Sequence, residues 1–161
     1  MAQATAAGAL AAWIDPDDRF DPASAGAAGA ELGRLLWLRG GEAGPGLKPA
    51  LAAAATLAGS GLFELLVLDL AATPPGTLRR LPGATWIRLQ RAVAETRSAL
   101  LLLGGSHLAC GPGGARLALD ASRPLWSGRP GPGRLLSGLG ARAVAGRHAT
   151  RCVSFELRAS H

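Results

Sequence analysis

Short apolar runs alternate with polar, glycine-rich or proline-rich breaks along the first two thirds of the chain. Runs of this length with few or no charges are typical of strands that are buried on both faces of a parallel sheet. The pattern therefore predicts four strands, at Leu10–Ile14, Leu35–Arg39, Leu65–Leu70 and Ala99–Leu103.

Segments with helical character lie between these runs. Ala23–Leu32 is weakly helical, and Leu47–Gly59 carries Pro49 in its first turn, where proline is tolerated. Ala84–Ser98 is amphipathic, because apolar and charged residues recur at helical spacing on opposite faces. The apolar positions are Trp86, Leu89 and Val93, and the charged positions are Arg88, Arg91, Glu95 and Arg97.

The remaining segments are less regular. Thr73–Gly83 predicts a proline- and glycine-rich loop with two arginines, and Ala115–Ala121 predicts a short helix. Pro124–Ser127 and Cys152–Leu157 predict late strands, of which the second alternates apolar and polar residues as a half-exposed edge strand does. The glycine-rich stretch Gly128–Gly146 between them predicts a flexible connection.

The order of these elements predicts the fold class. Strands that alternate with helices favour a mainly parallel sheet with right-handed crossovers, flanked by helices. The late strands are expected to add an antiparallel extension to it. We see no linker and no internal repeat, so residues 1–161 are expected to form a single α/β domain, which is long enough to bury a core.

Charge divides the chain into an acidic front and a basic back. Met1–Leu78 holds eight acids and four bases, whereas Arg79–His161 holds three acids and thirteen bases, which together give the net charge of +6. This asymmetry favours a face that is available to an anion such as nucleic acid. The alternative is a solvated arginine-rich surface, because nearly exclusive use of arginine over lysine is also typical of a compositional bias.

The sequence carries little sign of metal sites or membrane association. Cys110 and Cys152 lack metal-ligand or CxxC spacing, and we expect no metal and no cofactor. The apolar runs are too short to cross a bilayer, and Met1 is not followed by a basic segment of a signal peptide. These features predict a cytoplasmic protein with reduced thiols.

Five segments resemble the core of the RecA recombinase family in their order and spacing. AAWIDPDDRFDPASA resembles a strand that ends in an acidic turn followed by a DP dipeptide, and LLVLDLAA resembles the Walker B strand. The others are LAGSG, GGARLALDAS and TRCVSFEL. In order along the chain, the five cover Ala11–Ala25, Leu57–Gly61, Leu65–Ala72, Gly113–Ser122 and Thr150–Leu157. The resemblance implies a RecA-like core.

The resemblance assigns former ATPase roles to two aspartates. Asp69 matches the Mg²⁺-coordinating aspartate, and Asp17 matches the carboxylate that orients the attacking water. A P-loop needs GxxxxGK[ST] to hold the phosphates, and this motif is absent from the sequence. We therefore expect a core without its N-terminal part and its phosphate-binding loop, in which Asp69 and Asp17 are vestigial and ATP is not hydrolysed.

The segments that match the two DNA-binding loops of RecA are short here, at Thr73–Gly83 and Leu108–Pro112. RecA relatives that keep the core without ATPase activity include the ImuA-type accessory proteins of SOS mutagenesis. That resemblance implies a role in translesion synthesis through contacts with RecA and with ImuB, an inactive Y-family polymerase homologue. SulA-like division inhibitors share a similar degenerate core and stay an alternative.

Two further hypotheses remain beside the accessory protein. One is a nucleic-acid-binding module in recombination or repair, and the other is an NTPase whose phosphate loop lies outside the given sequence. Direct contacts with DNA are expected to be weak or indirect. The candidate residues for partner or DNA binding are arginines of the basic half, namely Arg79, Arg80, Arg88, Arg91, Arg129, Arg134 and Arg142.

Overall fold

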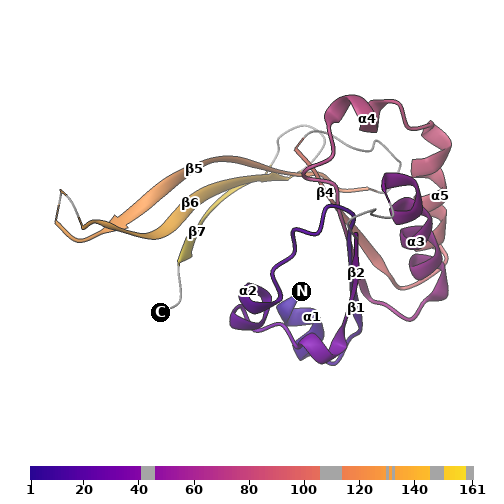
Figure 1. Ribbon diagram of the computed structural model, residues 1–161, viewed down its shortest axis with the longest axis horizontal. Coiled ribbons are helices and arrows are strands. Elements are labelled where there is room, and N and C mark those ends of the chain that lie inside the picture. The colour runs from indigo at the N-terminus through magenta and orange to yellow at the C-terminus, as the bar shows by residue number, and fades with distance from the viewer. Residues whose placement is uncertain (41–45, 106–113, 130, 132, 146–150, 159–161) are drawn as a thin grey trace. The chain divides into compact units, whose positions relative to one another are not determined.

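The chain forms two compact units, Met1–Gly111 and Pro112–His161, in a computed structural model (Figure 1). The structure describes residues 1–40, 46–105, 114–129, 131, 133–145 and 151–158. The first unit contains a four-stranded parallel sheet with helices, and the second a separate antiparallel sheet. The α/β class is thereby confirmed. The sequence predicted one domain over 1–161, whereas the packing divides the chain into two units.

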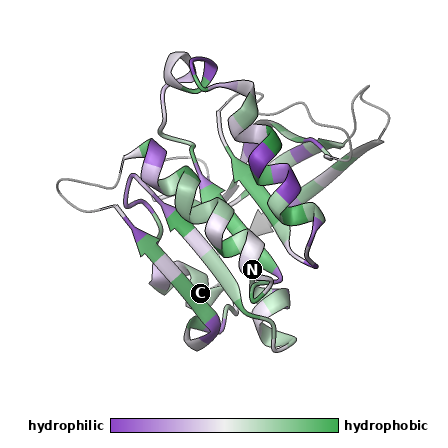
Figure 2. Cartoon of the chain, turned by 90° about the vertical axis from the view of Figure 1, so that its right-hand side faces the viewer, coloured by the Kyte–Doolittle hydropathy of each residue, from purple (hydrophilic) through white to green (hydrophobic). Residues whose placement is uncertain are grey.

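The sheet of the first unit has the strand order β2-β1-β3-β4, and all its neighbouring strands are parallel. Figure 2 shows that these strands are largely hydrophobic, but only the two central strands, β1 and β3, are mostly buried, whereas β2 and β4 are partly exposed. All four predicted strands are confirmed to within one residue at each end. Their bounds are β1 Ala11–Asp15, β2 Leu35–Arg39, β3 Leu65–Asp69 and β4 Ala99–Leu103.

Two long helices, α3 (Leu47–Ser60) and α5 (Gly83–Ala94), cover one face of this sheet and pack against each other (Figure 1). Alanines at positions 50, 54 and 58 are fully buried and share one side of α3. Their small side chains let the helix lie close to the strands. The largest cluster of buried residues comprises Ile14, Ala50, Leu51, Ala54, Leu68, Leu70, Leu78 and Leu89.

Shorter elements lie on the other side of the sheet (Figure 1). The Thr5 hydroxyl accepts the backbone N–H of Glu31 at 3.0 Å, which ties the first helix to the segment before β2. Asp21 caps the second helix by accepting the N–H of Ala23 at 3.0 Å. The short elements are α1 Ala2–Ala6, α2 Pro22–Ala27 and the 3-10 helix η1 Leu32–Arg34.

Two predictions within the first unit need correction. The predicted loop Thr73–Gly83 contains a helix, α4 (Pro75–Arg79), because a proline at the first helical position favours its start. The predicted helix Ala84–Ser98 is too long, since α5 ends at Ala94. Beyond it the Ser98 hydroxyl donates to the carbonyl of Phe63 at 2.6 Å and holds the chain in a turn.

The second unit is an antiparallel sheet with the strand order β5-β6-β7. The predicted helix Ala115–Ala121 is wrong, because most of it belongs to β5. The stretch Gly128–Gly146 is not a flexible connection throughout, since it contains the central strand β6. Hydrogen bonding to strands on both sides outweighs the low strand propensity of its glycines. The bounds are β5 Leu117–Ser127, β6 Leu135–Ala145 and β7 Arg151–Arg158.

The late strands therefore form a sheet of their own rather than an extension of the parallel sheet. The shortened connection predicted at Leu108–Pro112 lies outside the described residues. Among the described helices, none is long and apolar enough to cross a bilayer.

Candidate functional site

The carboxyl ends of the parallel strands bring the acidic residues of the first unit to one edge of the sheet. Asp15 ends β1 and pairs with Arg39 at the end of β2. The register also pairs Ile14 with Leu68, so Asp15 and Asp69 follow at the ends of neighbouring strands. Strand β2 pairs with one edge of β1, and β3 pairs with the other edge, so the direction of strand order reverses at β1. In open α/β sheets, ligands bind outside such a reversal of strand order.

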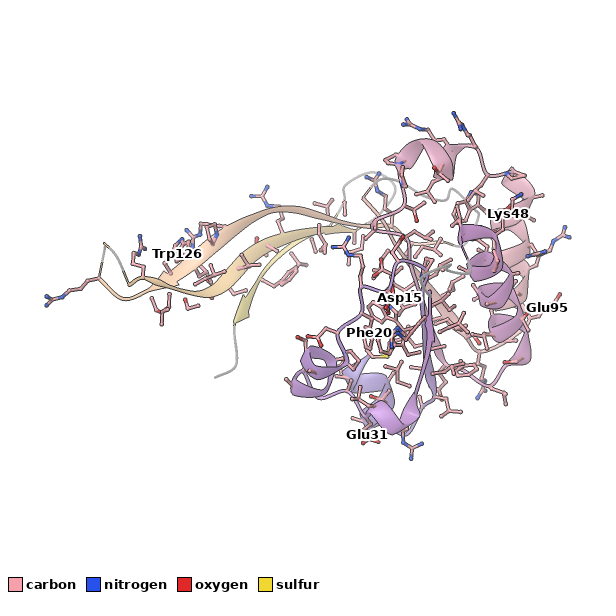
Figure 3. All side chains as sticks on the ribbon, in the orientation of Figure 1. Asp15, Phe20, Glu31, Lys48, Glu95 and Trp126 are labelled. Carbon is pink, nitrogen blue, oxygen red and sulfur yellow. The ribbon has the colours of Figure 1, made fainter. Side chains whose placement is uncertain are left out.

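Asp15 is buried and uses its carboxylate to organise the turn after β1. It is 1% exposed. Its oxygens accept the backbone N–H groups of Arg19 at 3.0 Å and Phe20 at 2.8 Å, and the indole N–H of Trp37 at 3.3 Å. Figure 3 shows Asp15 and Phe20 close together on this side of the sheet. Three internal donors occupy this carboxylate, so its role is structural.

The aromatic rings beside Asp15 pack on one another. The Phe20 ring lies 4.6 Å from the Trp13 ring and 5.4 Å from the Trp37 ring, measured between centroids. The guanidinium of Arg39 lies 4.4 Å from the centroid of the Trp37 ring, within the range of a cation–π contact. The cluster fixes the turn between β1 and α2 against the sheet.

Asp18 forms a two-point ion pair with Arg39. The Arg39 Nε and Nη2 atoms each donate to a carboxylate oxygen of Asp18 at 2.8 Å. The hydrogen bonds from Arg39 lower the pKa of Asp18, and the carboxylate in turn raises the pKa of Arg39. Asp18 adopts a positive φ of 52°, which aspartate tolerates better than most residues. The pair links the ends of β1 and β2.

The two aspartates that the RecA resemblance selected make fewer contacts than Asp15 and Asp18. Asp17 is exposed and makes no hydrogen bond or ion pair within the described part of the chain. Asp69 accepts the N–H of Ala71 at 3.0 Å, two residues further on, which is a local turn contact. Sequence reasoning therefore chose Asp17 and Asp69, whereas the structure gives the central contacts to Asp15 and Asp18. The apolar run that ends at Asp15 was the available signal.

Four candidate arginines lie on α4 and α5. Arg79 ends α4 and Arg80 is its C-terminal cap, while Arg88 and Arg91 lie three residues apart on the exposed side of α5. All four are exposed. The ion pairs found among the described residues are Glu31 with Arg34 and Asp18 with Arg39, so these four arginines have no acidic partner there.

The three other candidate arginines belong to the second unit but not to one flexible segment. Arg129 lies in the connection between β5 and β6, and Arg134 directly precedes β6. The Arg134 guanidinium lies 5.8 Å from the ring centroid of Trp126. Arg142 lies within β6, opposite Ser154 of β7. Eight residues of extended chain separate Arg134 from Arg142, about 27 Å.

The net charge is distributed differently when the chain is divided at the boundary between the two units. Residues 1–111 hold nine acids and nine bases, and residues 112–161 hold two acids and eight bases. The first unit is therefore neutral, and the second carries the whole net charge of +6. The acidic front that the sequence indicated is balanced within its own unit by the five arginines at positions 79, 80, 88, 91 and 97, of which three lie within α4 and α5.

The sheet of the second unit has two chemically different faces, which sequence reasoning missed. Residues paired across an antiparallel sheet share a face, and the register sorts them. The apolar face includes Leu117, Leu119, Pro124, Leu139, Ala141, Ala143, Ala145, Val153 and Phe155, and the register places Arg151 opposite Ala145 at one end of it. The opposite face, called the arginine face here, includes Arg123, Arg142, Ser154 and Glu156, which also line a shallow depression, and the register places Asp120, Leu125 and Val144 on the same face.

This division had a partial signal in the sequence. The alternation within Cys152–Leu157 correctly indicated a strand with two different faces. Leu117 and Leu119 alternate with Ala118 in the same way, although a short helix is predicted from the sequence over Ala115–Ala121.

Among the described residues, no three His, Cys, Asp or Glu side chains gather closely enough to hold a metal ion. Comparison with known proteins finds neither a matching family model nor a matching curated sequence. The resemblance to RecA therefore depends on the sequence segments quoted above.

Proposed function

We propose that this chain is a non-catalytic binding protein whose basic second unit makes the main contacts with a partner. The observation that supports this most directly is the charge map, in which the second unit carries the whole net charge of +6. Its arginines are exposed in the described parts of β5, β6 and the connection between them. Exposed guanidinium groups pair with carboxylates and phosphates and are enriched at interfaces.

The carboxyl edge of the parallel sheet supports the non-catalytic half of the proposal. A general base or a metal ligand needs a carboxylate that is free to meet a substrate or an ion. Here Asp15 accepts three internal hydrogen bonds, and Asp18 is engaged by Arg39. These groups stabilise the turn that joins β1 to α2, and they are poorly placed to exchange partners during a reaction.

The resemblance to ImuA-type proteins supplies the biological setting of the proposal. In that setting the chain is an accessory protein of SOS-induced translesion synthesis, and its partners are RecA and an ImuB-like polymerase homologue. The proposed accessory role requires a stable core and exposed contact residues, and both features are present in this chain. The setting also implies that the protein acts in the cytoplasm.

A second candidate function is nucleic-acid binding by the second unit. It is favoured by the arginine face and by the guanidinium of Arg134 beside the exposed ring of Trp126. Arginine beside an aromatic ring is a common arrangement in proteins that bind single strands, where bases stack on the ring. Salt distinguishes the candidates, because binding to DNA weakens steeply as counterions are added.

The proposal is tested by two triple variants that each remove three positive charges. Arg129, Arg134 and Arg142 change to Ala in the first, and Arg79, Arg88 and Arg91 change to Ala in the second. We expect the first variant to bind immobilised ImuB homologue or RecA at least about tenfold more weakly, a loss of about 1.4 kcal/mol. The second should lose less than about twofold, with the helix content of both unchanged.

The outcomes separate the alternatives. Equal losses in both variants would mean that net charge, and not the second unit, governs binding. Full retention in the first variant would refute the proposed surface. Fluorescence anisotropy with single-stranded DNA at 50 and 200 mM salt supports the second candidate if binding falls by orders of magnitude between them.

A further inference from the structure

The nine residues named for the apolar face of the second unit are uncharged, and several of them are exposed. Leu119 is 67% exposed, Leu117 and Val153 are each 61% exposed, and Leu139 is 37% exposed. Monomeric proteins rarely expose contiguous apolar patches larger than a few hundred Å² unless the patch is a contact site. A face of this composition therefore indicates an interface.

The second unit also lacks a second layer of its own. Stable domains pack at least two layers of secondary structure around a core. Among its described residues, Ala143 at 9% exposed is the single hydrophobic side chain that is buried. A three-stranded sheet gains stability mainly through a covered hydrophobic face. The apolar face is thus the place where the missing layer belongs.

The distribution of charge limits which kind of partner can cover the apolar face. A partner recognised through acidic or phosphate groups would bind the arginine face, on the opposite side of the sheet. The nine residues named for the apolar face offer such a partner no ion pair. Its natural complement is an equally apolar and pleated surface, because antiparallel sheets pack face to face with interdigitated side chains.

A second copy of the chain supplies such a surface. In a two-fold arrangement the same patch serves both subunits. Packing the two apolar faces together leaves both arginine faces outward, so the like charges stay on opposite sides of the pair. A single contact then covers both patches.

The size of the face fits a modest dimer. Three strands about 4.8 Å apart, with about 27 to 36 Å of length each, give a face of roughly 450 Å² per copy. Two copies would bury about 900 Å², which is below the roughly 1,200 Å² of stable specific interfaces and within the range of weak, transient contacts. An interface of this size predicts a weak and reversible dimer.

We infer that two copies of this chain associate through the apolar faces of their second units and form a six-stranded β-sandwich. The interface centres on Leu119, Ala143 and Val153, which lie side by side across the three strands. This inference does not depend on the proposed function. It concerns the opposite side of the sheet from Arg123 and Arg142.

Sedimentation equilibrium of the full chain over about 1 to 300 µM tests this. The Leu119→Glu variant should weaken the dimer at least about tenfold, because a buried carboxylate without a partner is costly. Leu62→Glu is the matched control, since Leu62 is also 67% exposed but lies in the first unit. It should change the dissociation constant by less than about twofold.

A second, more conservative variant distinguishes a weakened dimer from a loss of folding. Val153→Thr keeps the branched shape that favours strands and replaces one methyl by a hydroxyl. It should weaken the dimer several-fold while circular dichroism stays unchanged. A parent chain that stays monomeric up to 300 µM would overturn the inference. So would a dimer that both variants leave intact, because the contact would then lie elsewhere, such as at the free edge of β7.

Discussion

At the scale of single residues, side-chain hydrogen bonds organise the acidic turn after β1. Asp15 accepts two backbone N–H groups within the turn, and three further hydrogen bonds, two of which form the Asp18–Arg39 ion pair, join the turn to β2. Gly40 completes this arrangement. A Cβ at this position would lie 2.1 Å from the carbonyl oxygen of Pro16, so only glycine fits there.

Replacing Asp15 with asparagine tests the structural role of its carboxylate. Asn keeps one acceptor oxygen but presents an NH₂ group to donors that now point at the second oxygen. We expect the free energy of unfolding to fall by about 2 to 3 kcal/mol, measured by urea denaturation. The control is Asp17→Asn at the exposed neighbouring position, which should change it by less than about 0.5 kcal/mol. Equal effects would contradict the assigned role.

The ion pair between Asp18 and Arg39 predicts a pH dependence. Because the pKa of Asp18 is lower in the folded state, the pair stabilises the fold above the unfolded pKa of about 3.9. This contribution disappears as the pH falls through the lower folded value. The parent should therefore be more stable than Asp18→Asn at pH 7, and the difference should shrink by pH 3. A difference that is the same at both pH values would exclude the pair as its cause.

At the scale of elements, the strands of the first unit were predictable because each is apolar on both faces and bounded by turn residues. Helix α3 was predictable as well, whereas α4 was not. Its proline and glycine, Pro75 and Gly76, indicate a loop in isolation. The helix forms because Leu78 is buried in the core, which is a tertiary effect that local sequence does not contain.

Strand β6 was missed for a related reason. Its glycines at 138 and 140 lower strand propensity, and its partner strands lie at different distances along the chain. The central position of Asp15 in the turn was indicated only by the apolar run that ends there, and four acidic residues lie between 15 and 21. Which of them is buried depends on Trp37 and Arg39, which arrive from another strand.

The alanine side of α3 predicts a strict size limit. Ala54 is fully buried between the helix and the sheet, whereas Ala52 on the same helix is exposed. Ala54→Leu should destabilise the protein by about 1 to 3 kcal/mol through overpacking, as measured by thermal or urea unfolding. Ala52→Leu adds the same atoms to the same helix, and we expect a change within about 0.5 kcal/mol. A tolerated Ala54→Leu would show that α3 is not closely packed.

At the scale of the whole molecule, the two units differ in net charge and in how their hydrophobic residues are buried. The neutral first unit holds the described hydrophobic core and its fixed acidic turn. The second unit holds the net positive charge and two contrasting faces. The proposed function assigns partner binding to the arginines of the second unit, and the inferred dimer uses the apolar face behind them.

The central claim is that the carboxylates at the sheet edge serve the fold and do not serve nucleotide chemistry. Calorimetric titration of the full chain with Mg·ATP tests it most directly. The account predicts no saturable heat up to millimolar nucleotide, because the sequence contains no GxxxxGK[ST] loop and Asp15 and Asp18 are already engaged. A saturable isotherm with a micromolar dissociation constant, lost in Asp69→Asn, would contradict it.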